Sequence, residues 1–178
     1  AGKLHESLLR TEAEPYHIHL AMLLIGTNSE ARAAALGAQV ARARKDPPTA
    51  ERAPFIGNLD EPVVHRVIEG EKVNVWVSWK TGEAEKRCRV EDLIYNRQTK
   101  QPAQHGGWIY NGSRIVNGNF LVQRDGSIIA IIEDLDALIN NPRSGRENDE
   151  IWEVNSTNLP PAATAVQISI QFEISAGQ

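Results

Sequence analysis

The clearest pattern along the chain is an alternation of apolar and polar residues between positions 71 and 80. In "KVNVWVSWK" one face carries Val73, Val75, Val77 and Trp79, and the other carries Asn74, Trp76 and Ser78. A period of two is typical of a β-strand. Thr81-Gly82 is a turn signal, and the charged segment 83–90 follows it. The sequence therefore predicts an antiparallel hairpin whose second strand turns its charges outward.

Further strand signals follow in the second half of the chain. The strongest is the final segment, with alternating apolar positions Val166, Ile168, Ile170, Phe172 and Ile174. Shorter strands are predicted at 106–113, ending in a glycine turn, and at 150–154. Segments 119–123 and 127–132, joined by Arg124-Asp125-Gly126, predict a second hairpin. Segment 90–96 predicts a helical turn, and 134–141 predicts a short helix stopped by Pro142.

In the first third of the chain the apolar residues follow the spacing of a helix instead of a strand. Pro15 suits the first turn of a helix and Gly26 suits its end, so a helix is predicted over 15–25. Its apolar positions are three and four residues apart, at Ile18, Ala21, Met22 and Ile25. A short strand is predicted before it, over 3–9. A second helix should start at the Thr27–Glu30 capping box and end at Lys45, before a proline-rich loop over 46–61.

These elements predict an α+β fold. An N-terminal strand and two helices would pack on a mainly antiparallel β-sheet with short helical inserts. The length of 178 residues fits a single domain over 1–178.

Composition removes several classes of function. A net charge of −4 and a pI near 5.8 argue against nucleic-acid binding, which needs clustered cationic residues. The single cysteine, Cys88, excludes an internal disulfide framework but not an extracytoplasmic location. The longest apolar run, residues 20–25, is far shorter than a membrane span. The start at Ala1-Gly2, without Met, suggests a processed or trimmed N-terminus.

Three of the five histidines stand in the first nineteen positions and suggest a metal site. His17 and His19 lie two apart, however, and side chains at that spacing on a helix point about 200° away from each other. They therefore cannot both bind one ion. His5 with only one of them remains as an alternative, against the more ordinary interpretation of histidines packed at a helix start.

The sequence gives only weak indications of a catalytic nucleophile or a catalytic pair of carboxylates. His5 and Ser7 share one side of the predicted strand, but adjacent side chains on a strand rarely have the geometry of a nucleophile and its base. Ser113 stands in a tight turn without a neighbouring base. The pairs Glu91-Asp92 and Glu133-Asp134 are explained by predicted helix starts. Cys88 fits a buried inert thiol better than a reactive one, and 142–149 is predicted to be a charged surface loop.

The order of several motifs resembles a known family. "HESLL", "EPYHIHLAMLLIG", "VNVWVSWKTGEAEKRCRVEDLIYN", "GGWIYNGS", "GSIIAIIEDLDALINNP", "DEIWEVN" and the final alternating strand are together similar to the YdjY-domain family. Its members are bacterial extracytoplasmic proteins of unknown biochemical function. The match is weakest over 27–61, which looks like a lineage-specific insertion. The resemblance implies that His5, Glu6, Ser7 and His19 recur in the family, and that upstream strands and a lipid anchor can precede this chain.

The sequence leaves four functions open. The leading hypothesis is a non-catalytic extracytoplasmic module that binds a ligand or protein partner or joins an assembly, without a cofactor. The second is a metal- or redox-linked accessory protein in which His5, Glu6 and His19 hold a transition metal such as zinc or copper. The third is a serine hydrolase using Ser7 or Ser113. The fourth is structural, with strand addition at an exposed edge near 3–9 producing a homo-oligomer. Ser7 is expected at a polar junction with His5, Glu6 and His19.

Overall fold

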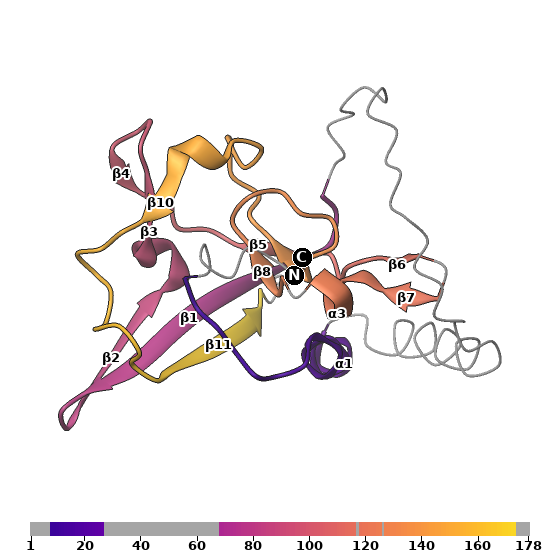
Figure 1. The fold of residues 1–178 in the computed structure, drawn as a ribbon, viewed down its shortest axis with the longest axis horizontal. Coiled ribbons are helices and arrows are strands. Elements are labelled where there is room, and N and C mark those ends of the chain that lie inside the picture. Colours follow the sequence, from indigo (N-terminus) through magenta and orange to yellow (C-terminus); the bar gives the residue numbers. More distant parts are fainter. Residues whose placement is uncertain (1–7, 27–67, 117, 126, 174–178) are drawn as a thin grey trace, which may run out of the picture.

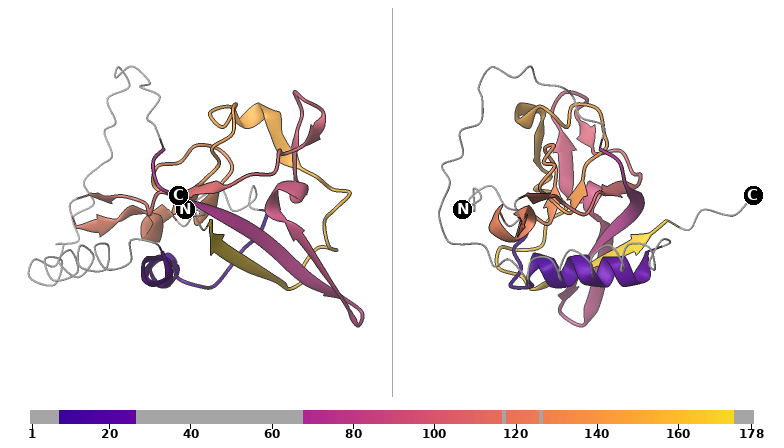
Figure 2. Two further views of the ribbon diagram at one scale, coloured as in Figure 1. Left: turned by 180° about the vertical axis from the view of Figure 1, so that it is seen from behind. Right: turned by 90° about the vertical axis from the view of Figure 1, so that its right-hand side faces the viewer.

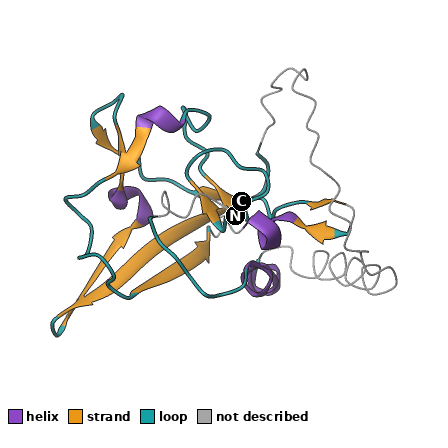
Figure 3. Cartoon of the chain, in the orientation of Figure 1, coloured by secondary structure: helices purple, strands orange, loops and turns teal. Residues whose placement is uncertain are grey.

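A computed structural model describes residues 8–26, 68–116, 118–125 and 127–173. The helices are α1 (Pro15–Ile25) and α3 (Leu121–Asp125), with 3₁₀ helices η2 (Val90–Leu93) and η3 (Asp149–Ile151). The strands are β1 (Glu71–Thr81), β2 (Ala84–Arg89), β3 (Ile94–Asn96), β4 (Gln101–Pro102), β5 (Trp108–Tyr110), β6 (Ile115–Val116), β7 (Asn119–Phe120), β8 (Ile129–Ala130), β9 (Ile139–Asn140), β10 (Trp152–Val154) and β11 (Val166–Phe172). The described part is therefore α+β but rich in strands (Figure 3).

Strand β1 is the centre of the main sheet, whose order is β11-β1-β5-β9-β8. Seven residue pairs join β1 to β11 along one edge. Its other edge is shared, because β5 pairs with residues 71–73 and β2 pairs with residues 76–81. The predicted apolar face is confirmed: Val73, Val75 and Val77 are fully buried, and Trp79 is 8% exposed.

The first predicted hairpin is also confirmed. Strands β1 and β2 are antiparallel, with Thr81 opposite Ala84 across a two-residue turn. Gly82 in that turn has φ +63°, a conformation that costs glycine little and other residues more. The outer half of the hairpin projects from the body of the molecule (Figure 1).

Helix α1 has the predicted bounds, but only part of its predicted apolar side faces the core, since Met22 is buried and Ile18 packs against the core whereas Ala21 is exposed. Its buried residues are His19, Met22 and Leu23, whereas Ile25 is 72% exposed. The polar His19 is thus turned inward and an apolar residue outward, which spacing alone does not reveal. The helix end approaches the sheet at Gly26, where a Cβ would lie 3.3 Å from the Phe172 ring of β11 (Figure 2).

The predicted hairpin over 119–132 is wrong. Strand β7 instead pairs antiparallel with the preceding strand β6, and Gly118, just before β7, has φ +76°. Residues 121–125 form α3, and β8 pairs in parallel with β9. In the sequence Gly118 follows Asn117, and Asn-Gly is the strongest two-residue hairpin signal.

The predicted helix over 134–141 is also wrong. The segment is a turn leading into β9, because side chains compete for its backbone groups. The Asp134 carboxylate accepts a hydrogen bond from the Asp136 N–H (2.9 Å). The fully buried Asn140 amide donates to the Asp134 carbonyl (2.8 Å) and accepts from the Asp134 N–H (2.9 Å).

Two smaller sheets complete the described part, β10-β3-β4 and β6-β7. The helical turn predicted at 90–96 covers only η2, since residues 94–96 form β3. Of the strand predicted at 3–9, only Leu8 and Leu9 are described; they are not in a strand and pack against the core. Residues 3–7, the predicted second helix and the loop over 46–61 lie outside the described residues.

Candidate functional site

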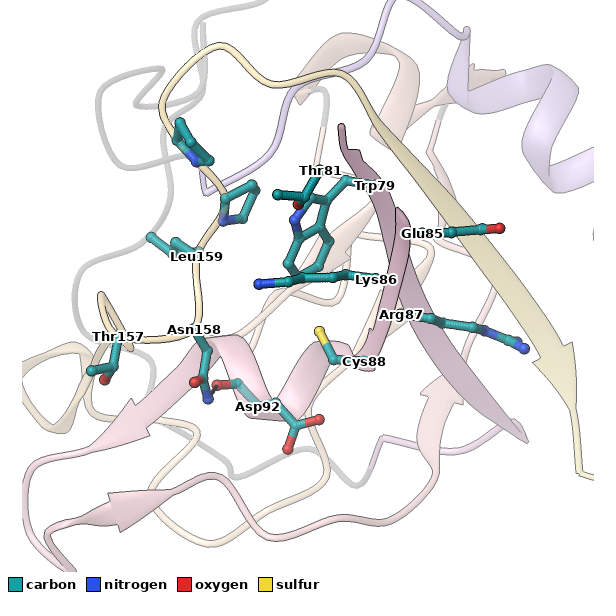
Figure 4. Close-up of a pocket in the computed structure, with 12 residues that line it drawn as sticks. Trp79, Thr81, Glu85, Lys86, Arg87, Cys88, Asp92, Thr157, Asn158 and Leu159 are labelled. Carbon is teal, nitrogen blue, oxygen red and sulfur yellow. Dashed lines mark hydrogen bonds between the residues drawn. The ribbon is translucent and has the colours of Figure 1, made fainter. Parts of the chain in front are cut away.

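A groove with a volume of about 620 Å³ lies beside the projecting hairpin. The β1–β2 hairpin forms one wall, and the segment 157–161 forms the other (Figure 4). The lining residues are Trp79, Thr81, Glu85, Lys86, Arg87, Cys88, Asp92, Thr157, Asn158, Leu159, Pro160 and Pro161. Residues about seventy positions apart in sequence therefore meet at this site.

The strand period determines which hairpin side chains reach the groove. Lys86 is opposite Trp79, and Cys88 is opposite Val77, so these side chains share the apolar face of the hairpin. Lys86 and Cys88 point into the groove, whereas Glu85 and Arg87 point away from it (Figure 4). On the far side, Arg87 lies over the Trp76 ring, with 4.5 Å between the guanidinium carbon and the ring centroid.

The opposite wall is fixed by amide side chains. The Asn155 and Asn158 amides both donate to the Asp92 carbonyl, at 2.9 and 3.0 Å. This anchors the segment to η2 and places Leu159, Pro160 and Pro161 across from the hairpin. The two prolines have no N–H to donate, so this part of the wall is apolar apart from its carbonyl groups.

The charges of the groove are unequally available to a ligand. One Asp92 oxygen lies 2.7 Å from His105 Nε2, and the other accepts the Arg89 N–H at 3.0 Å. The exposed Lys86, in contrast, makes no hydrogen bond or ion pair with any other described residue. The ammonium group of Lys86 is therefore the charge that the groove offers.

Cys88 is not an activated nucleophile. Burial raises the pKa of its thiol, and the nearby Asp92 carboxylate raises it further. The thiolate is the reactive form, so the thiol stays protonated and slow to react at neutral pH. This favours the inert interpretation of Cys88.

Next to the groove lies a buried charge cluster of Arg89, Glu91 and Arg143. Glu91 is fully buried, and its Oε1 accepts hydrogen bonds from Arg89 Nη2 (2.9 Å), Arg143 Nη2 (3.0 Å) and the Gly106 N–H (3.2 Å). Arg143 also lies over Trp108, 5.1 Å from the ring centroid. Burial lowers the pKa of Arg143, against the raising effect of Glu91. The cluster joins β2, η2 and two loops.

The sequence does not predict this cluster. Its pattern places Glu91 at a helix start and Arg143 in a surface loop, yet the Arg143 side chain is only 12% exposed. The two residues are 52 positions apart, so no local pattern relates them. Only the opposite charges of Arg89 and Glu91, two residues apart, could have indicated a structural ion pair.

His19 and His17 have different environments. His17 is exposed, whereas His19 is 8% exposed and its Nδ1 lies 2.8 Å from the Tyr110 hydroxyl. Gly112, at φ +76°, lies so close that a Cβ there would be 3.2 Å from His19 Cε1. His5, Glu6 and Ser7 lie outside the described residues. The metal site of His5, Glu6 and His19 and the polar junction with Ser7 therefore stay predictions.

The remaining candidates have structural contacts. The Ser113 hydroxyl donates to the Asp136 carbonyl and accepts the Val122 N–H at 3.2 Å. Glu133 pairs with Arg146 at 3.0 Å, and neither Glu133 nor Asp134 starts a helix. The predicted surface loop 142–149 thus contributes two arginines to ion pairs.

The fold and groove define a strand-rich α+β domain with a ligand-sized groove. Within the described ranges no three His, Cys, Asp or Glu side chains are grouped to hold a metal ion. No helix in the described part of the chain is long and apolar enough to cross a membrane. The chain belongs to the YdjY-domain family, whose model matches residues 1–171. No curated protein and no solved structure matches it.

Proposed function

We propose that this chain is a non-catalytic extracytoplasmic binding module whose groove receives a short segment of a partner protein. The observation that carries the proposal is the groove itself, with an apolar floor at Trp79, an apolar wall at Leu159 and Pro160, and one available cation at Lys86. Pockets of about 300–1,000 Å³ lined by apolar groups with a few polar ones are typical of ligand sites.

The arrangement favours a partner segment with an apolar residue next to a carboxylate. Burial of the apolar residue against Trp79 and Leu159 supplies affinity, because removing apolar surface from water is favourable by about 25 cal/mol per Å². A carboxylate beside Lys86 supplies orientation through a charge-assisted hydrogen bond. The Asp92 carboxylate, already engaged by His105 and Arg89, selects against an acid placed deeper in the groove.

Two features support the non-catalytic part of the proposal. The groove contains a thiol with a raised pKa, and His105, which does not line the groove, pairs with Asp92 rather than with a nucleophile. The extracytoplasmic location is supported by the family resemblance, and fractionation of the native cells with an antibody against the protein tests it.

A random-sequence peptide library, displayed on phage and selected against the protein, tests the groove. We expect enriched peptides to pair an acidic with an apolar residue, and Lys86→Gln to weaken their binding about tenfold or more, equivalent to about 1.4 kcal/mol. Lys80→Gln is the matched control, since Lys80 is also an exposed hairpin lysine but faces the opposite side. Equal binding by the two variants contradicts the proposal.

The alternative of a metal-linked protein is tested separately. Elemental analysis of protein purified from its native source distinguishes it, since a site built on His5, Glu6 and His19 requires stoichiometric metal that is lost in His19→Ala. A turnover activity that disappears in a folded His5→Ala variant would contradict the non-catalytic assignment.

A further inference from the structure

Strand β11 ends the main sheet without a described strand on its outer side. It pairs with β1 and with no other strand of the described residues. Its sequence, "VQISIQF", contains no charged residue and no proline. Charged side chains and proline are the usual devices that prevent an edge strand from pairing with another chain. The outer edge of β11 lacks both.

The sequence of β11 reads almost the same in both directions. Ser169 is its centre, with Ile168 and Ile170 on either side of it, then Gln167 and Gln171, then Val166 and Phe172. Two antiparallel copies related by a two-fold axis at Ser169 therefore place like residues opposite each other. An interface of this kind must be self-complementary, because both subunits contribute the same surface.

The backbone N–H and C=O groups of β11 point in the directions that such a pairing requires. The Glu173 N–H donates to the Lys72 carbonyl at 2.9 Å, so Lys72 and Glu173 form a hydrogen-bonded pair. In an antiparallel ladder the backbone groups of alternate residues point to the same side. Ser169 therefore directs its N–H and C=O toward β1, whereas Ile168 and Ile170 direct theirs outward.

We propose that this chain forms a two-fold symmetric homodimer through antiparallel pairing of β11 with β11 of a second copy, centred on Ser169. Ile168 exchanges two hydrogen bonds with Ile170 of the partner subunit, and Val166 exchanges two with Phe172 of the partner subunit. The same pairs form again by symmetry. The two Ser169 residues meet as a non-hydrogen-bonded pair, and the sheet continues across the axis.

Side chains support the same register. Ile168 is 36% exposed, and in the dimer it lies beside Ile170 of the partner subunit on the apolar face. Gln167 and Gln171 of the partner subunit face each other on the polar side. A shift by two residues shortens the paired segment from seven residues to five and loses the Val166 and Phe172 pairs. A single strand pair is smaller than the roughly 1,600 Å² of a standard interface, so the dimer is reversible.

Sedimentation analysis of the chain from low micromolar to millimolar concentration tests the dimer. We expect a monomer–dimer equilibrium that Ser169→Lys abolishes, because two lysines then meet at the axis. Gln167→Lys is the matched control and keeps the dimer, since Gln167 faces a glutamine. Circular dichroism verifies that both variants fold. A strict monomer throughout, as expected if another segment of the same chain occupies the β11 edge, overturns the proposal.

Cross-linking tests the register independently of affinity. In a Cys88→Ala background, Ser169→Cys places two thiols on a pair whose Cα atoms are about 4.5 Å apart, within disulfide range. Mild oxidation should give a disulfide-linked dimer. In Gln167→Cys the two thiols are about 13 Å apart along the strands, so little cross-linking is expected. Equal cross-linking of the two variants overturns the register. Neither experiment depends on the groove.

Discussion

The two edge strands that flank β1 are built differently. Four of the six residues of β2 are charged, namely Glu85, Lys86, Arg87 and Arg89, whereas the seven residues of β11 carry no charge. Charges on an exposed edge oppose pairing with a second strand. The charges of β2 therefore oppose the addition of another strand on the side that carries the groove. The uncharged edge of β11 permits the pairing with a second copy that we propose.

The β2 side depends on a buried ion pair, and its removal has the largest expected effect. Glu91→Ala leaves Arg89 and Arg143 without their shared carboxylate, and breaking a buried pair in this way costs about 3–5 kcal/mol. Urea denaturation measures the loss. Hydrogen exchange should show that β2 and η2 lose protection before β11 does.

The control for this variant is an ion pair between exposed side chains. Glu153 lies 3.7 Å from Arg97, with side chains 48% and 62% exposed. Glu153→Ala should therefore change stability by less than about 1 kcal/mol. Equal losses for the two variants contradict the assignment of Glu91 as the anchor of β2.

A smaller effect is expected where α1 packs against Tyr110 of β5. Tyr110→Phe removes the hydroxyl that lies 2.8 Å from His19 Nδ1, and Tyr110 also meets Phe172 of β11 edge to face at 5.8 Å between centroids. Loss of a buried hydrogen bond costs about 1–3 kcal/mol. Thermal unfolding measures it, and exchange protection should fall in α1 rather than in β2. Protection lost first in β2 would contradict the assignment of Tyr110 as the contact that holds α1.

Neutralising β2 tests the role of its charges directly. The triple variant Glu85→Thr, Lys86→Thr and Arg87→Thr gives β2 an uncharged edge of high strand propensity. We expect stability to change by less than about 1 kcal/mol, because exposed charges contribute little. Light scattering should detect species larger than the dimer. If the triple variant associates no further than the wild-type protein does, the charges of β2 are not what prevents this edge from pairing with another chain.

The smallest effect concerns Cys88 on the groove wall. Because the pKa of its thiol is raised, iodoacetamide should react more slowly with Cys88 in the folded protein than in urea at the same pH. The folded state also binds the thiol proton more tightly than the unfolded state. The contribution of Cys88 to stability is therefore fully present below the unfolded pKa of about 8.5 and is lost as pH rises through the higher pKa of the folded state. Asp92→Asn should accelerate the reaction modestly; an unchanged rate would exclude Asp92 as a cause.

Local patterns predicted the elements whose determinants are local. Pro15 and the alternation of β1 and β11 act within a few residues, so α1, the first hairpin and the last strand were found with nearly correct bounds. Residues 119–141 were mispredicted because Asn140 and the parallel β8–β9 pairing satisfy backbone groups across a distance. The N-terminal candidates His5, Glu6 and Ser7 lie outside the described residues.

The groove was beyond prediction for the same reason. Its hairpin wall follows from the strand period, but its second wall depends on Asn155 and Asn158 reaching the Asp92 carbonyl more than sixty residues away. Similarly, Glu91 could not be assigned to an ion pair before Arg143 was placed beside it. Sequence patterns indicated which faces were apolar, and long-range contacts decided where those faces formed a site.

The position of β2 and β11 on opposite edges of β1 has a consequence for avidity. In the proposed dimer the two grooves lie at the two far ends of one continuous sheet, so neither obstructs the other. A partner displayed in many copies would engage both, and the second contact would be intramolecular, at a raised effective concentration. The amount of such a bivalent protein bound to a surface rises more steeply with the density of its ligand than the amount of a bound monomer does.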